Sequence, residues 1–105
     1  MVHGREITIQ TKGFSDIRDI TGEVKRMIAE SSVKNGIAVV FAVGSTASIS
    51  TIEYEPALVE DVRDQLDRLA PGSMRSRHSE TWGDDNGFSH LRATLMGPGI
   101  TVPFA

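Results

Sequence analysis

The sequence predicts a single α+β domain built on antiparallel sheet, and three observations lead to this prediction. Several segments have the alternating or continuous apolar pattern of β-strands, two others carry an apolar stripe at helical spacing, and the connections between strands are as short as those of hairpins. No repeat, linker or low-complexity tract interrupts the chain. Because 105 residues suffice for one small core, we expect a single domain over residues 1–105.

The two helices are predicted where apolar residues recur every three or four positions. The first helix is expected to begin at Asp19 as N-cap and to run to about Ser31. The second is expected to begin at Pro56, since proline is tolerated in the first helical turn, and to end at Pro71-Gly72. Its acidic face is explained most simply as a solvated surface.

Strands are predicted for residues 6–11, 37–43, 47–54, 90–96 and 100–104. The continuous apolar run of 37–43 is typical of a strand buried on both faces, whereas 6–11 and 90–96 alternate between apolar and polar residues. We expect 37–43 and 47–54 to pair as a hairpin, because only a short Gly-Ser-Thr turn interrupts them.

Composition and net charge limit the classes of binding partner that are expected for this chain. The net charge is −3 and no cluster of Lys or Arg occurs, so neither a nucleic acid nor an anionic membrane is an expected partner. The absence of cysteine excludes disulfides and thiolate chemistry. No apolar run approaches membrane-spanning length and the N-terminus lacks a signal-peptide pattern. A soluble, cytoplasmic protein is the expectation.

Functional groups are concentrated in residues 78–90, which show neither helical nor strand periodicity and are predicted to form a loop. His78 and His90 could converge on one cation, with Asp84 or Asp85 as a carboxylate ligand. The spacing is not diagnostic, since Asp-Asp-Asn-Gly is also ordinary turn composition. The histidines are therefore either catalytic or metal-binding groups, or surface and structural residues.

Gly44-Ser45-Thr46 is a second candidate site. A glycine followed by two hydroxyl residues at the end of a buried strand can present backbone N–H and hydroxyl donors to a phosphate or carboxylate. The segment lacks the lysine and the glycine spacing of a P-loop. The alternative is a tight hairpin turn without a ligand.

Four segments, taken in order, carry a resemblance to a known family: residues 37–47, 51–56, 78–90 and 95–103. The most specific is Glu-Thr-Trp-Gly-Asp at 80–84, followed by Asn-Gly and Ser-His. Together they resemble the YjbQ family, also designated UPF0047, over nearly the whole chain. The resemblance implies a compact fold with β-sandwich-like antiparallel sheets and two helices, assembled as a homotrimer.

The same resemblance implies a function. It suggests a weak, secondary thiamine-phosphate synthase activity, in which a pyrimidine diphosphate is joined to a thiazole phosphate and pyrophosphate is released. The catalytic pocket would use His78, Asn86 and His90, with Ser45 and Thr46 nearby to bind phosphate. It could also hold a divalent metal such as zinc or magnesium at His78 and His90. The expected partner is a small phosphorylated metabolite. A metal-assisted hydrolase and a non-catalytic ligand-binding trimer are the alternatives.

The chain departs from the family pattern in two ways. Many relatives have histidine where this chain has Gly44 and Phe88, so a metal site here would have fewer ligands. Relatives also continue beyond the Thr-Val-Pro segment with a turn and a further strand. We therefore expect the chain to lack the C-terminal strand segment of the family, which would leave an exposed edge at 100–104.

Overall fold

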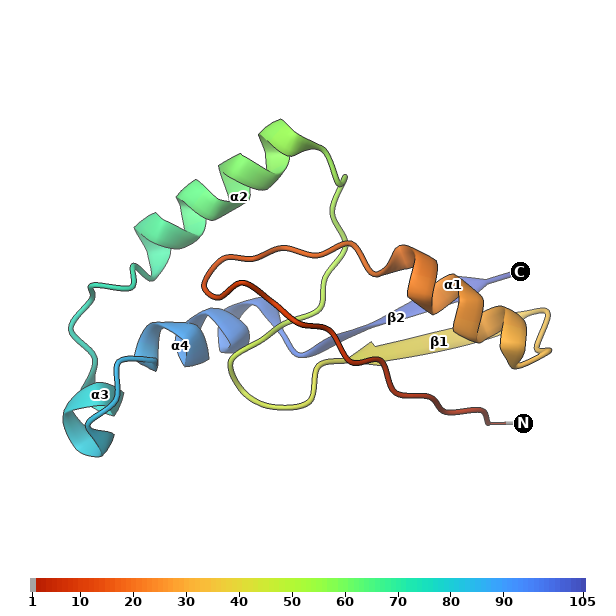
Figure 1. Ribbon diagram of the computed structural model, residues 1–105, viewed down its shortest axis with the longest axis horizontal. Coiled ribbons are helices and arrows are strands. Elements are labelled where there is room, and N and C mark those ends of the chain that lie inside the picture. The colour runs from red at the N-terminus through yellow and green to blue at the C-terminus, as the bar shows by residue number, and fades with distance from the viewer. Residues whose placement is uncertain (1) are drawn as a thin grey trace. The chain divides into compact units, whose positions relative to one another are not determined.

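The computed structural model describes residues 2–105, which form four helices and two strands (Figure 1). In chain order these are α1 (Thr21–Glu30), β1 (Gly36–Phe41), α2 (Pro56–Leu69), α3 (Arg77–Trp82), α4 (Gly87–Met96) and β2 (Gly99–Phe104). The α+β class is confirmed, but the prediction of two helices is wrong. The chain divides into two units, residues 1–38 with 101–105 and residues 39–100, which are described separately.

The first unit contains α1, residues 36–38 of β1 and residues 101–104 of β2. The predicted first helix is confirmed, although Ile20 rather than Asp19 is its N-cap. Asp19 still contributes, because its Oδ1 accepts a hydrogen bond from the Thr21 N–H at 2.9 Å. The helix ends in a turn at Ser31, and Ser32 adopts a left-handed backbone with φ 62°. The strand predicted for 6–11 does not form, since this segment finds no strand to pair with and alternation alone does not hold a strand.

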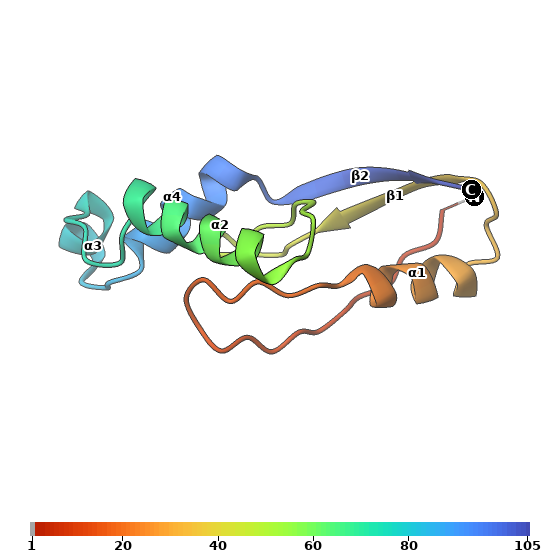
Figure 2. The ribbon, with the colours of Figure 1, turned by 90° about the horizontal axis from the view of Figure 1, so that it is seen from above.

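The sheet consists of β1 and β2, which lie side by side (Figure 2). Their pairing is antiparallel, since the start of β2 meets the end of β1: a Cβ atom added to Gly99 would lie 2.6 Å from the carbonyl oxygen of Val40. The N–H of Ala42 also donates to the carbonyl of Pro98 at 2.8 Å. The predicted hairpin of 37–43 with 47–54 is therefore wrong. Residues 47–54 have no strand partner, while the strand predicted for 100–104 is confirmed as the partner of β1.

The second unit contains α2, α3 and α4. The predicted helix at Pro56 is confirmed, and it is capped by Glu55, whose carboxylate accepts the N–H groups of Ala57 and Leu58 at 2.8 and 2.9 Å. These two bonds lower the pKa of Glu55 below its ordinary value. The predictions of a loop at 78–90 and a strand at 90–96 are wrong, because these residues form α3 and α4.

The small core explains why α4 is a helix. The buried residues of α4 are Gly87, Phe88, Arg92 and Ala93. Phe88 and Arg92 stand four residues apart, on one helix face, and the adjacent pairs 87–88 and 92–93 would point to opposite faces of a strand. The strand was predicted from the alternation of Leu91, Ala93 and Leu95; of these Ala93 is buried, whereas Leu91 and Leu95 are exposed. The buried face of α4 includes a charged residue, Arg92, so a pattern of apolar residues alone does not reveal this face.

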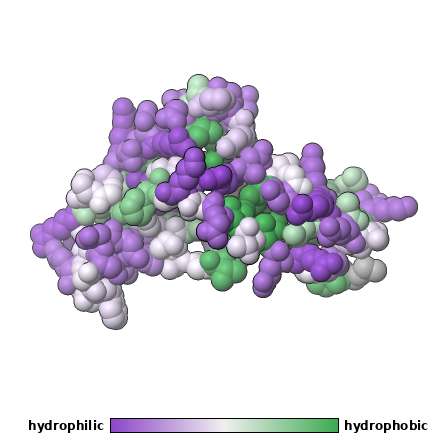
Figure 3. All heavy atoms as spheres, viewed as in Figure 1, coloured by the Kyte–Doolittle hydropathy of each residue, from purple (hydrophilic) through white to green (hydrophobic). Residues whose placement is uncertain are grey.

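Much apolar surface remains exposed. Figure 3 shows hydrophobic residues at the surface among hydrophilic ones. On β1, alternate side chains point to one exposed face: Ile37, Val39 and Phe41 are each more than 60% exposed. Within residues 2–105 no helix combines the length and the hydropathy needed to cross a lipid bilayer.

Candidate functional site

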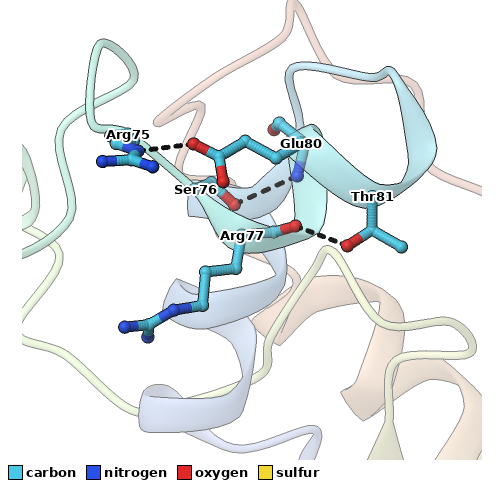
Figure 4. Close-up of polar contacts among 6 residues, drawn as sticks. Arg75, Ser76, Arg77, Glu80 and Thr81 are labelled. Atoms are coloured by element: carbon cyan, nitrogen blue, oxygen red, sulfur yellow. Dashed lines mark hydrogen bonds and ion pairs between the residues drawn. The ribbon is translucent and has the colours of Figure 1, made fainter.

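The segment that carries the first histidine is a short helix with well-defined ends. Ser76 caps α3 through its Oγ, which accepts the N–H of Ser79 at 3.3 Å. The Arg75 guanidinium pairs with the carboxylate of Glu80, and the Thr81 hydroxyl donates to the Arg77 carbonyl (Figure 4). Local capping therefore fixes six residues that sequence periodicity did not mark as helical.

A left-handed turn after α3 brings a carboxylate back to the helix. Gly83 has φ 73° and ψ 21°, a conformation that glycine adopts without strain, and its N–H bonds to the carbonyl of Ser79. The next residue, Asp84, places Oδ1 3.0 Å from Nδ1 of His78. Both side chains are partly exposed, at 42% for Asp84 and 36% for His78. A hydrogen-bonded Asp–His pair therefore links the turn after α3 to the first turn of that helix.

The two histidines singled out in the sequence do come together. The ring of His78 in α3 and the ring of His90 in the first turns of α4 have their centroids 4.6 Å apart, with a tilt of 40° between their planes. The helix contact depends on Gly87, which is buried at the start of α4. A Cβ atom on Gly87 would lie 1.9 Å from the Oγ of Ser76 and 3.5 Å from the Cβ of His78.

Asn86 lies directly before α4 as its N-cap, but its side chain does not cap the helix. The side-chain Oδ1 is buried and has no hydrogen-bond partner within residues 2–105. A buried acceptor without a donor costs free energy, so this oxygen is an unsatisfied polar group at the start of α4. His78, Asn86 and His90 therefore come from two helices that contact one another.

Ser45 and Thr46 lie elsewhere. They form an exposed bend after β1, and in the described chain no hydrogen bond joins them to His78, Asn86 or His90. The neighbouring Ser48 instead donates to the sulfur of Met96 at 3.8 Å, at the opposite end of α4 from Asn86. His90 and Met96 are separated by about 9 Å along the helix, at about 1.5 Å per residue. The phosphate-binding role of Ser45 and Thr46 stays a prediction.

A metal site was considered for His78 and His90. Across residues 2–105, no group of three or more His, Cys, Asp or Glu side chains is arranged to hold a metal ion. The bond of Asp84 to Nδ1 leaves Nε2 as the ligand atom of the His78 ring, and Phe88 supplies no ligand atom. His78 and His90 alone do not make up the three or four protein ligands of a zinc site.

Phe88 has a structural role that the sequence comparison with histidine-bearing relatives did not indicate. Its ring is 4% exposed, and the guanidinium carbon of Arg92 lies 4.9 Å from the ring centroid. Arg92 also donates to the carbonyl of Ala70 and to the carboxylate of Asp67. These contacts join α4 to the end of α2. The buried position of Arg92 was missed because a lone arginine in a polar pattern gives no sequence signal of burial.

An open cleft of about 500 Å³ lies beside the histidine pair, between the 72–76 segment and the starts of α3 and α4. Its polar lining carries both charge signs and includes Ser73, Arg75, Ser76, Glu80 and Asp85. Neither His78 nor His90 lines it. The cleft is therefore a neighbour of the histidine pair and not the same site.

The geometry defines a small α+β protein in which two helices bring a carboxylate-bound histidine against a second histidine. Residues 5–105 match the family model described as "UPF0047 protein YjbQ-like", and the chain belongs to this family. A UPF0047 protein of Methanothermobacter thermautotrophicus is 34% identical over 102 residues, which cover 97% of this chain and 70% of the relative. A UPF0047 protein of Archaeoglobus fulgidus is 31% identical over 98 residues, covering 93% and 74%.

Solved structures agree on the fold. A YbjQ-like protein of unknown function from Sulfolobus solfataricus superposes with a TM-score of 0.76 at 36% identity, over 83% of this chain and 62% of that one. An uncharacterized conserved protein of the yjbq/upf0047 family from Clostridium acetobutylicum gives 0.77 at 31% identity, over 90% and 72%. The chain thus has a YjbQ-like fold and spans about two thirds of the length of these proteins.

Proposed function

We propose that this chain is an acid–base enzyme acting on a small phosphorylated metabolite, with His78 and His90 as the catalytic residues. The observation that supports this proposal is the close approach of the two imidazole rings, one of which is bonded to a carboxylate. Imidazole is the side chain best suited to take and give protons near neutral pH. Two adjacent rings place two such groups together, and either can donate a hydrogen bond or a proton to a leaving group.

The specific reaction proposed is the transfer implied by the family resemblance. The thiazole nitrogen attacks the methylene carbon of the pyrimidine diphosphate; a C–N bond forms, the C–O bond breaks, and pyrophosphate leaves with the electron pair. A protonated histidine would stabilise the negative charge that develops on the leaving oxygen by donating a hydrogen bond. Asn86, which directly precedes the helix of His90 and has a buried Oδ1 without a partner among residues 2–105, is proposed as a further residue of this site.

The test is pyrophosphate release from the two precursors, measured with the wild type and with His78→Ala, His90→Ala and His3→Ala. His3 is the matched control, because it is the third histidine of the chain, is exposed and belongs to the other of the two units. Loss of an acid–base group should lower the rate by about 10²-fold or more, while His3→Ala keeps the wild-type rate. Equal rates in the wild type and all three variants, or no release above the uncatalysed reaction, would rule the proposal out.

We also propose that the chain self-associates, as the homotrimer that the resemblance implies. The supporting observation is the exposed apolar face of β1 formed by Ile37, Val39 and Phe41. A two-stranded sheet is marginal by itself and such a face is costly in water, so packing against another copy would stabilise it. A sandwich-like arrangement of sheets would then arise between copies.

A further inference from the structure

We propose that Asp84 is a positioning residue that fixes the tautomer of His78. This inference rests on the proposed catalytic role of His78. Asp84 is not one of the two paired histidines, and its proposed task is to determine which of the two ring nitrogens of His78 carries the proton. The position of this proton decides which nitrogen can do the chemistry.

The geometry supports the assignment. Oδ1 of Asp84 lies 3.0 Å from Nδ1 of His78, within hydrogen-bond range. A carboxylate can only accept, so Nδ1 must be the nitrogen that carries hydrogen, and Nε2 is left with its lone pair. Neutral imidazole in water prefers the opposite arrangement, with hydrogen on Nε2. The carboxylate therefore reverses the ordinary preference of the ring.

The backbone holds Asp84 in place for this contact. Gly83 adopts the left-handed conformation and its N–H closes on the carbonyl of Ser79, so the chain turns back immediately before Asp84. The next acid, Asp85, follows the same turn but makes no hydrogen bond within residues 2–105 and lines the neighbouring cleft. Of these two adjacent aspartates, only Asp84 is hydrogen-bonded to the imidazole of His78 among residues 2–105.

The tautomer of His78 matters because the ring of His90 lies next to it, at 4.6 Å between centroids. With Nδ1 of His78 occupied by Asp84, only Nε2 can exchange a proton with substrate. The bond to the Asp84 carboxylate also opposes rotation of the imidazole ring, because a rotated ring would lose its hydrogen bond at Nδ1. Asp84 would thereby fix both the identity of the reacting nitrogen and the orientation of the ring against His90.

The experiment measures ¹⁵N chemical shifts of the histidine rings in the full chain over a series of pH values, and reads the tautomer ratio on the alkaline plateau where the shifts no longer change. Asp84→Asn keeps the shape but removes the charge, and Asp85→Asn is the matched control. We expect His78 in the wild type and in Asp85→Asn to carry hydrogen mainly on Nδ1. In Asp84→Asn the Nδ1–H to Nε2–H ratio should fall by about three- to tenfold, allowing for partial solvent exposure.

A wild-type His78 with hydrogen mainly on Nε2 would overturn the inference, as would an equal ratio in wild type and Asp84→Asn. Circular dichroism and the thermal midpoint establish that both variants fold. Because the shifts need no substrate, the inference and the proposed activity can fail separately. If the enzyme is active, Asp84→Asn should lower kcat more than it raises KM, and Asp85→Asn should change neither.

Discussion

Arg92 in α4 donates from Nε to the carbonyl oxygen of Ala70 at 2.9 Å, and both partners are buried, at 8% and 0% exposure. The same guanidinium reaches Asp67 at 3.1 Å and lies over the ring of Phe88. One cation therefore satisfies the carbonyl that follows α2 and covers the largest aromatic residue of the core. It is the main polar link between α2 and the helix that carries His90.

Replacing Arg92 with Met should destabilise the chain by about 2–3 kcal/mol, since the buried Ala70 carbonyl loses a charged donor. The free energy of unfolding in urea gives the measurement. Arg75→Met is the matched control, because Arg75 is also ion-paired but is 87% exposed, and its loss should cost no more than about 1 kcal/mol. Equal losses in the two variants would contradict the assigned role of Arg92.

Gly87→Ala should disturb the contact between α3 and α4. The new methyl would lie 1.9 Å from the Oγ and 2.7 Å from the Cβ of Ser76, so the two helices must separate at a cost of about 1–3 kcal/mol. The control is Gly72→Ala, whose methyl would meet only the Phe88 ring at 3.5 Å, an ordinary contact. In the double variant Gly87→Ala/Ser76→Gly the two losses should be less than additive, which a double-mutant cycle in urea would measure.

Glu55→Ala should destabilise α2 in a pH-dependent way. The pKa of Glu55 is lowered by the N–H groups of Ala57 and Leu58, from an ordinary value of 4.5. A carboxyl whose pKa is lower in the folded chain stabilises the fold above the unfolded value and loses this effect as pH falls through the folded value. The thermal midpoint of Glu55→Ala should be a few degrees below the wild type at neutral pH, and the charge-dependent part of the gap should disappear in acid. Glu53→Ala, without a capping bond, should show no such gap.

Phe41→Lys tests the apolar face of β1. The side chain is 61% exposed, so a lysine fits the isolated chain, but its charge would be buried if this face packs against another copy. Sedimentation should show a shift toward monomer for Phe41→Lys and no change for Thr101→Lys, an exposed position on β2. A monomeric wild type, or a variant that associates as strongly as the wild type, would remove the proposed trimer.

The elements that sequence predicted correctly are those whose signal is local. Pro56 and the stripe behind it define α2, and the run at 37–43 defines β1, because capping and continuous apolar character act within a few residues. The pairing of β1 was missed for the opposite reason. A short Gly-Ser-Thr turn favours a hairpin, but the strand partner that wins lies at 99–104, and nothing local indicates it.

The site was predicted in part for similar reasons. The histidines at 78 and 90 were recognised as a possible pair from their residue types, and the structure brings their rings together. Their helical setting was not recognised, because Gly83 and Gly87 suggest a loop, whereas they end one helix and begin the next. The role of Asp84 needed the left-handed turn at Gly83, which depends on backbone geometry that spacing alone does not reveal.

The pairing of β1 with β2 also bears on how the chain folds. Residues 42–98 separate the two strands, so the sheet depends on a long-range contact, which forms slowly because a large loop must close first. During synthesis β1 leaves the ribosome well before β2 does. Until β2 has been made, the apolar residues of β1 have no strand to pair with. In that interval the segment resembles an aggregation-prone strand, and we expect it to be a preferred binding site for chaperones that hold unfolded chains.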